Sequence, residues 1–199
     1  MPHAVAFDVG GVLIHWDPRL LYRKLLPTEE AVEHFLATVC PSEWNERLDA
    51  GLPLAEGIAE RIERFPQHEP LIRAYAERFG EMMLPMQRSI ALLHELAERR
   101  VPLFALSNWA AETFERTHTL FPFLSAFDGL VISGQIGLAK PDPRIFRHLL
   151  DRHGLSAGET LFVDDRASNV EAARALGIEG LLFEGPTSLR AALVQHGLL

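Results

Sequence analysis

The sequence of 199 residues has little cysteine, no long apolar run and a deficit of basic residues. Cys40 is the only cysteine, which excludes an internal disulfide and a cysteine-rich zinc site. No segment approaches the ~20 apolar residues of a membrane-spanning helix. Asp8 interrupts the apolar stretch that begins at Ala4, which is too early for a signal peptide. We therefore expect a cytoplasmic protein with no membrane partner.

The shortage of basic charge bears on partners. There are 27 acidic residues against 19 Lys and Arg, a formal net charge of −8, and no basic block interrupts the chain. This balance argues against a nucleic-acid groove, because phosphate backbones are bound mainly by clustered Lys and Arg. An anionic small molecule would have to be held by a few placed cations, a metal ion or backbone amides.

What the sequence does contain is enough apolar material for a large core, at 48% of its residues. The apolar residues gather in short, nearly continuous runs, which are typical of parallel strands buried on both faces. The predicted strands are His3–Phe7, Val101–Leu106, Gly129–Ile132, Thr160–Val163 and Gly180–Phe183.

Helical patterns separate most of these strands, at Ser89–Arg99, Ala110–His118, Pro143–His153 and Asn169–Leu176. Alternation of strands and helices predicts an α/β fold, a Rossmann-like parallel sheet with helices on both faces.

One stretch breaks the alternation. From about residue 18 to residue 86 we find no convincing strand, only amphipathic helical patterns such as Glu29–Val39, Leu54–Arg64 and Glu69–Met83. A helical insertion directly after the first strand is better explained as an α-helical cap over the sheet than as a crossover. We therefore predict a catalytic core of residues 1–15 and 88–199 and a cap of residues 16–87.

Four short motifs could carry chemistry, and the first two are neutral or acidic. Asp8 follows the first strand and is itself followed by Gly10 and Gly11, which allow a phosphate-sized group to approach the backbone. Ser107 and Asn108 end the second strand and could form an anion cradle with the amides of the next helix. Taken singly, each motif is also explained by ordinary turn or helix capping.

The other two motifs bring opposite charges. Lys140 lies between a glycine turn and two prolines, which would hold it more rigidly than a surface lysine, although most lysines are simply solvated. Asp164 and Asp165 follow the fourth strand, and adjacent carboxylates repel unless a cation or hydrogen bonds offset the repulsion. Mg²⁺ suits such a pair, and an exposed acidic turn is the alternative.

All four motifs fall at the carboxyl ends of predicted strands, which places them on one rim of one sheet. In this order, with a helical cap after the first motif, the sequence resembles the haloacid dehalogenase superfamily over essentially its whole length. Members of that superfamily form an aspartyl enzyme intermediate. The resemblance also implies that the first strand lies at the centre of the sheet, between the second and the fourth.

The resemblance implies a role for each motif residue. Asp8 would be the nucleophile, and Ser107 and Asn108 would hold the transferring phosphoryl oxygens near the Gly11 backbone. Lys140 would neutralise the phosphate and the nucleophile.

The resemblance also implies a magnesium site. Asp8, Asp165 and the main-chain carbonyl of Gly10 would hold Mg²⁺, and Asp164 would assist directly or through water. Asn169 stands where many members have a further acid, so its part would be secondary.

One position departs from the pattern of most phosphatases in the superfamily. They carry a second aspartate two residues after the nucleophile, which protonates the leaving oxygen and activates water, and this chain has Gly10 there. A branch of the family with this glycine includes sugar phosphatases. Asp17 or His15 could substitute, although both are also explained as turn residues.

Three functions therefore compete. The first is a magnesium phosphatase acting on a small phosphorylated molecule, such as a sugar phosphate. The second is a metal-free 2-haloacid dehalogenase, in which halide leaves without a proton. The third is a degenerate member that binds phosphate with little turnover. The paired acids Asp164 and Asp165 favour the phosphatase, because they are costly without a cation. A signalling receiver domain is disfavoured, since it keeps its acidic pair after the first strand.

Substrate selectivity is expected to come from the cap. Trp16, Trp44, Asn45 and Arg47 could reach the substrate, and Trp109 could line the pocket, although the tryptophans could equally form core. The nine histidines show no paired metal spacing. We expect a monomer or homodimer.

Overall fold

The protein, described here by a computed structural model for residues 2–199, is built on a five-stranded parallel sheet. The strand order is β5-β4-β1-β6-β7, so the first strand is central between the second and fourth predicted strands, as expected. The strands are β1 (Ala4–Phe7), β4 (Leu103–Ser107), β5 (Gly129–Ile132), β6 (Thr160–Asp164) and β7 (Glu179–Leu182). Each agrees with a predicted strand to within two residues at either end.

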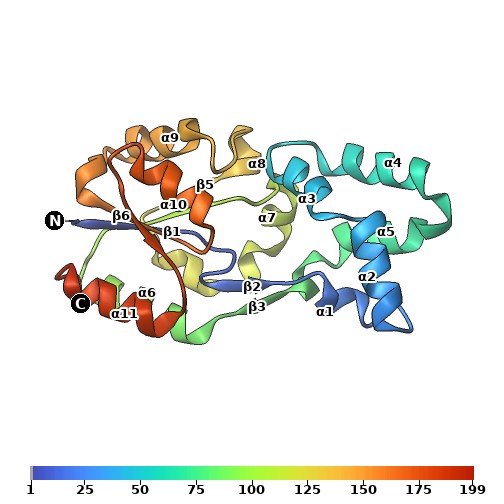
Figure 1. Cartoon of the computed structure of the whole chain (residues 1–199), viewed down its shortest axis with the longest axis horizontal. Coiled ribbons are helices and arrows are strands. Elements are labelled where there is room, and N and C mark those ends of the chain that lie inside the picture. Colours follow the sequence, from blue (N-terminus) through green and yellow to red (C-terminus); the bar gives the residue numbers. More distant parts are fainter. Residues whose placement is uncertain (1) are drawn as a thin grey trace.

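Helices cover both faces of this sheet (Figure 1). Side chains alternate along β1, so Ala4 and Ala6 pack on one face while Val5 and Phe7 pack on the other. The first face is covered by α9 (Pro143–His153) and α10 (Ala167–Arg174), and the second by α6 (Gln87–Glu98) and α11 (Pro186–Gln195). The predicted α/β fold with helices on both faces is confirmed.

A second group of helices lies beyond the carboxyl ends of the strands (Figure 1). These helices fall within residues 16–87, for which we keep the name cap. They are α1 (Arg19–Tyr22), α2 (Glu29–Thr38), α3 (Ser42–Asp49), α4 (Leu54–Arg64) and α5 (Glu69–Glu77), with 3-10 turns at Pro66–His68 and Phe79–Met82. The remainder of the chain is called the core. Two of its helices lie near the cap, α7 (Ala111–Thr117) and α8 (Ser133–Ile136). Three more 3-10 turns, at His118–Leu120, Pro122–Ala126 and Ala157–Glu159, complete the core.

The prediction of a cap without strands is wrong at one place. A two-stranded antiparallel ribbon of β2 (Ile14–Trp16) and β3 (Met83–Pro85) joins the core to the cap. The helix predicted for Glu69–Met83 accordingly stops at Glu77. Three-residue strands are too short to show a period of two, and the residues that pair in the ribbon are 67 to 71 positions apart in the sequence.

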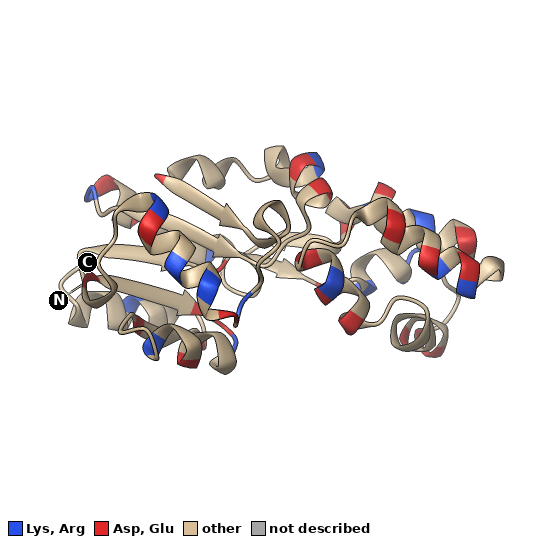
Figure 2. Ribbon diagram, turned by 90° about the horizontal axis from the view of Figure 1, so that it is seen from above, with Lys and Arg blue, Asp and Glu red and all other residues tan. Residues whose placement is uncertain are grey.

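Charged residues of both signs lie along the helices of the cap. Figure 2 shows acidic and basic residues interleaved along the helices of the cap. Across residues 2–199, no helix combines the length and apolar character that crossing a membrane requires.

Candidate active site

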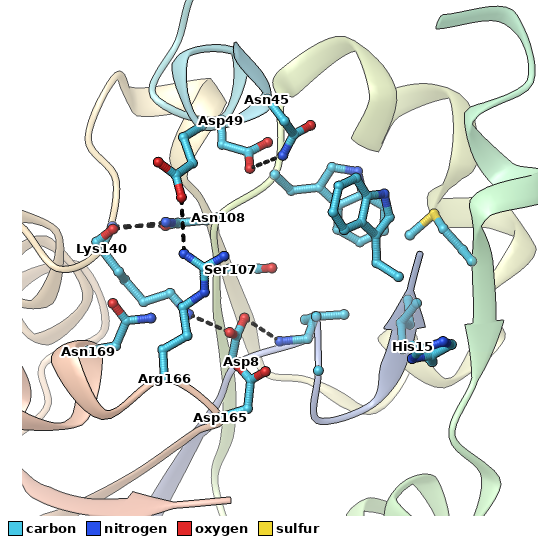
Figure 3. Close-up of a pocket in the computed structure, with 18 of the residues that line it drawn as sticks. Asp8, His15, Asn45, Asp49, Ser107, Asn108, Lys140, Asp165, Arg166 and Asn169 are labelled. Carbon is cyan, nitrogen blue, oxygen red and sulfur yellow. Dashed lines mark hydrogen bonds and ion pairs between the residues drawn. The ribbon is translucent and has the colours of Figure 1, made fainter. Parts of the chain in front are cut away.

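The four sequence motifs converge on one rim of the sheet. Asp8 follows β1, Ser107 ends β4, and Asp164 ends β6, so that parallel strands deliver all three to the same edge. Lys140 reaches this edge from the segment between α8 and α9. Between the rim and the cap lies a cavity of about 320 Å³, shown in Figure 3.

Lys140 is the centre of the rim. Its ammonium lies 3.0 Å from Asp8 Oδ2 and 2.7 Å from Asp164 Oδ2, and its side chain is fully buried. A buried charge is stable only when it is paired and hydrogen-bonded, and two carboxylates meet that requirement here. The lysine therefore holds the carboxyl groups of two different strands together.

Asp164 is fully engaged by protein donors. Besides Lys140, it accepts hydrogen bonds from Asn169 Nδ2, 3.0 Å from either oxygen, and from the backbone N–H of Arg166 at 2.8 Å. Asp164 and Asn169 are both buried. This arrangement fixes the position of Lys140 and leaves Asp164 less free than Asp165 to contact another group.

Asp165 extends the cluster toward the cavity. Oxygen atoms of Asp8, Asp164 and Asp165 all lie within 4.8 Å of one another, so three acids gather around one lysine. Burial raises the pKa of Asp8 to about 7, against the opposing charge of Lys140. Burial and the neighbouring Asp164 likewise raise the pKa of Asp165. The cluster thus has more acidic groups than Lys140 alone can compensate.

These residues fit a hard divalent cation. Mg²⁺ prefers a few carboxylate oxygens and keeps several waters, and Asp8 and Asp165 both line the cavity. The carbonyl of Gly10 is a further available oxygen, because among residues 2–199 it accepts no hydrogen bond. Ligation of Mg²⁺ by Asp8, Asp165 and the Gly10 carbonyl stays a prediction.

Ser107 and Asn108, the two residues of the predicted phosphate cradle, differ in their contacts. Asn108 exchanges two hydrogen bonds with the backbone of Lys140, Nδ2 to O at 2.9 Å and Oδ1 from N at 2.8 Å. The Asn108 side chain thus secures the segment that carries the lysine. Ser107 also lines the cavity, and no hydrogen bond within the described chain engages its hydroxyl. A contact of either residue with phosphate stays a prediction.

The two glycines after Asp8 meet different constraints. Gly11 has φ +73°, and a Cβ there would lie 2.1 Å from Asp165 Oδ2, so only glycine lets the carboxyl approach. The N–H of Gly11 is donated to the carbonyl of Ile14 at 2.8 Å, and its predicted phosphate contact is untested. At Gly10, an added Cβ would meet no atom within 4 Å.

The cap supplies the opposite wall through α3. Ser42, Asn45, Glu46 and Asp49 all line the cavity, and their spacing of three and four residues is that of one helical face. We did not predict Ser42, Glu46 or Asp49 as site residues. Their spacing on one polar face, separate from the face that buries Trp44 and Leu48, is the signal that could have found them.

Four further lining residues were also outside the sequence prediction. Arg166 follows Asp165 in the chain and lies 3.4 Å from Glu46 across the cavity entrance. Ile14, Phe79 and Met83 form apolar wall together with Trp16 and Trp109. Phe79 and Met83 become lining residues through the β2–β3 ribbon, which the sequence did not reveal.

The structure separates the suggested cap residues into two groups. Trp16, Asn45 and Trp109 line the cavity, and the indole N–H groups of both tryptophans are buried without a partner in the described chain. Trp44 instead packs against Tyr75 and donates to the carbonyl of Gly57 at 3.2 Å. Arg47 pairs with Glu60 on the surface. Neither of these two residues reaches the cavity.

The two candidate replacements for the missing acid also differ. His15 lines the cavity but is exposed. Asp17 is outside this cavity and accepts a hydrogen bond from the backbone N–H of Arg19 at 2.9 Å. Asp17 therefore stabilises the start of α1, which agrees with the turn interpretation.

Cap and core also meet beside the cavity. The carbonyl of Asp49 accepts from Ser133 Oγ, and the N–H of Leu54 is donated to Glu112 at 3.0 Å. Between them, the Gly51 backbone packs so closely on Gly137 that a Cβ at Gly51 would lie 3.2 Å from the Gly137 Cα. These contacts fix the C-terminal end of α3 against the rim.

The sequence is similar to those of known hydrolases. A family model described as haloacid dehalogenase-like hydrolase matches residues 2–177. A sesquiterpene phosphatase of Aspergillus oryzae is 31% identical over 181 residues, covering 89% of this chain and 88% of its own. A phosphorylated carbohydrates phosphatase of Thermotoga maritima is 30% identical, covering 96% and 92%.

Solved structures share the fold at lower identity. An enzyme of Bacteroides thetaiotaomicron, solved with magnesium and inorganic phosphate, aligns with a TM-score of 0.69 at 21% identity, covering 92% of this chain and 94% of its own. The L-2-haloacid dehalogenase of Xanthobacter autotrophicus, with chloropropionic acid covalently bound, aligns at 0.67 and 17%, covering 100% and 85%. At these identities the likeness concerns the fold alone.

Proposed function

Because the chain belongs to the haloacid dehalogenase-like hydrolases, we propose that it is a magnesium-dependent phosphatase of small phosphomonoesters that works through an aspartyl-phosphate intermediate. The observation that carries this proposal is the acid cluster around Lys140. Asp8 and Asp164 share the Lys140 ammonium at the floor of the cavity, and the Asp165 carboxyl lies beside them without an ion pair to Lys140. A metal-free dehalogenase has no need for so many acids, whereas a phosphatase needs a cation beside its nucleophile.

Each residue of the rim has a part in the proposed reaction. The Asp8 carboxylate attacks phosphorus, the bond from phosphorus to the alcohol oxygen breaks, and water later releases phosphate from Asp8. Lys140 offsets the phosphoryl charge and is held in place by Asp164 and by the Asn108 side chain. Ser107 donates its hydroxyl to a phosphoryl oxygen.

The metal would be held by Asp8, Asp165 and the Gly10 carbonyl, and Asp164 is proposed to act chiefly through Lys140. Bound magnesium supplies positive charge that stabilises the phosphoryl oxygens as charge develops on them. The charge imbalance at Asp8 and Asp165, whose pKa values are both raised, supports this assignment.

The organic part of the substrate is proposed to lie between two unlike walls. One is polar and belongs to α3 and Arg166, and the other is apolar and includes Trp16, Trp109 and Phe79. The two phosphatase relatives are named for a sesquiterpene, which is apolar, and for carbohydrates, which are polar. A panel of glucose 1-phosphate and farnesyl monophosphate tests which wall dominates.

The reaction itself is tested by phosphate release. Purified protein with Mg²⁺ should release phosphate from small phosphomonoesters, and Asp8→Asn should abolish the release. Glu43→Gln is the matched control, because Glu43 is an exposed acid on α3 outside the cavity. Halide release from 2-chloropropionate without metal, and no phosphatase activity, would overturn the proposal. Phosphate binding without turnover of either substrate would indicate a degenerate member.

A further inference from the structure

The proposed reaction needs a proton that the rim does not supply. When the phosphorus–oxygen bond breaks, an alkoxide leaves from the side of phosphorus opposite the attacking Asp8. Gly10 has no side chain to protonate it. The group that does so must therefore lie in the part of the cavity that faces Asp8, which is the wall formed by the cap.

Asp49 occupies that wall. Asp8 comes from the core and Asp49 from the last residue of α3 in the cap, and both line the same cavity, on different sides of it in Figure 3. The carbonyl of Asp49 accepts from Ser133 Oγ of the core, which fixes the end of α3 above the rim. Asp49 is thus held by contacts independent of its own carboxyl group.

The surroundings of the carboxyl group are well defined. Asn45 Nδ2 donates to Asp49 Oδ2 at 2.9 Å, and the Asn45 amide is itself oriented by the hydroxyl of Tyr75. Across the rim, the backbone N–H of Ala110 and the charge of Arg166 act on the carboxyl, while Glu46 opposes Arg166. Burial outweighs these effects and raises the pKa of Asp49 to about 7. A carboxyl group of this kind can hold and release a proton near neutral pH.

The other acids of the cavity are less suited. Glu46 is exposed and its carboxyl is paired with Arg166 at 3.4 Å. Asp165 belongs to the cluster that fits the cation, and Asp17 lies outside the cavity. His15 is exposed on the ribbon.

We propose that Asp49 is the general acid and base of the reaction, replacing from the cap the aspartate that Gly10 lacks. In the first step the protonated carboxyl gives its proton to the leaving alcohol oxygen as the phosphorus–oxygen bond breaks. In the second step the Asp49 carboxylate takes a proton from the water that attacks phosphorus, which frees Asp8 and restores the starting state. This inference rests on the proposed phosphatase function.

The test varies the leaving group. Asp49→Asn keeps the shape of the side chain but has no acidic proton. General acid catalysis is worth ~10²–10⁴ in rate, so the variant should lose about 100-fold or more in kcat on alkyl phosphates, whose alkoxides need a proton. On 4-nitrophenyl phosphate, whose phenolate leaves unaided, the loss in the bond-breaking step should stay within about threefold. Glu43→Gln should match the wild type on both substrates.

Two further measurements separate catalysis from mere positioning. The fall in wild-type kcat on alkyl phosphates at alkaline pH should be absent in Asp49→Asn, since the variant has no group to deprotonate. Gly10→Asp, for which the backbone leaves room, is added to Asp49→Asn. The double variant should have a kcat on alkyl phosphates at least tenfold above that of Asp49→Asn alone.

The outcomes distinguish the two proposals. Equal loss in the bond-breaking step on activated and alkyl phosphates, without rescue by Gly10→Asp, would overturn the role of Asp49 and leave the phosphatase standing. A wild type with no activity on either substrate would overturn the phosphatase and, with it, this inference.

Discussion

At the scale of single residues, the site depends on how closely side chains approach a bare backbone. Gly11 is the clearest case, because its φ is positive and Asp165 occupies the space of a missing Cβ. Lys140 depends in the same way on Asn108, whose side chain binds both backbone groups of the lysine. Small changes at such positions should move the whole rim.

Gly11→Ala should therefore lower both stability and activity. The positive φ alone costs a side-chain residue about 1–3 kcal/mol, and the clash would push Asp165 away from Asp8. Urea unfolding and the Mg²⁺ dependence of phosphate release measure the two effects. Gly10→Ala is the matched control and should unfold within about 0.5 kcal/mol of the wild type, because its Cβ meets no atom. Equal stability of both variants would contradict this account.

Asp49 should make stability depend on pH. Its pKa rises from 3.8 to about 7 on folding, so between these values the folded state holds a proton that the unfolded state has lost. Its contribution to stability is therefore full below about pH 4 and is lost as the pH rises through 7.

Asp49→Asn removes this dependence. The unfolding free energy of the variant relative to the wild type should rise by on the order of 2 kcal/mol between pH 5 and pH 8. Paired urea titrations at the two pH values measure the difference. A constant difference would mean that the carboxyl titrates normally.

At the scale of elements, the five core strands could be predicted because each is an apolar run buried on both faces. The motif residues Asp8, Ser107 and Asp164 followed from the ends of those strands. The β2–β3 ribbon could not be predicted, since its pairing is nonlocal and each strand has three residues. The cavity face of α3 was missed for a different reason: a polar helical face is equally typical of solvent contact, and only the position of the cap over the rim distinguishes the two.

The packing of α3 on α4 leads to a prediction with an unusual sign. Alanine normally stabilises a helix relative to glycine by about 0.5–1 kcal/mol. At Gly57, however, a Cβ would lie 2.6 Å from Leu48 Cδ2 and 3.1 Å from Trp44 Nε1. Gly57→Ala should thus destabilise the protein by about 1–3 kcal/mol.

Thermal unfolding of Gly57→Ala beside Gly158→Ala checks this sign. Gly158 has no atom within 4 Å of an added Cβ, so its variant should unfold close to the wild type. A Gly57→Ala protein more stable than the wild type would show that α3 and α4 separate easily.

At the scale of the whole molecule, a cation bound at the rim should stabilise the entire fold, because the acids come from strands that pair in the centre of the sheet. Binding to the folded state alone adds about 2.7 kcal/mol at a hundredfold excess over Kd. Mg²⁺ should therefore raise Tm, and EDTA should reverse the increase. Asp165→Asn should show little of this shift, whereas Asp142→Asn, at the partly buried N-cap of α9 and outside the cavity, should keep it. Equal shifts in both variants would place the cation elsewhere.

The contact between Gly51 and Gly137 has a mechanical consequence for the size of substrate that can react. Cap and core touch there through the backbones of two glycines. No flexible side chain at this contact can move aside to widen the space between α3 and the rim for a larger ligand. A bulky phosphomonoester that tilts the cap outward at this point would still place its phosphate beside Lys140 while carrying Asp49 out of reach. Such a molecule would behave as a competitive inhibitor and not as a slow substrate, and a single methyl group wedged in at residue 51 should extend that behaviour to smaller esters.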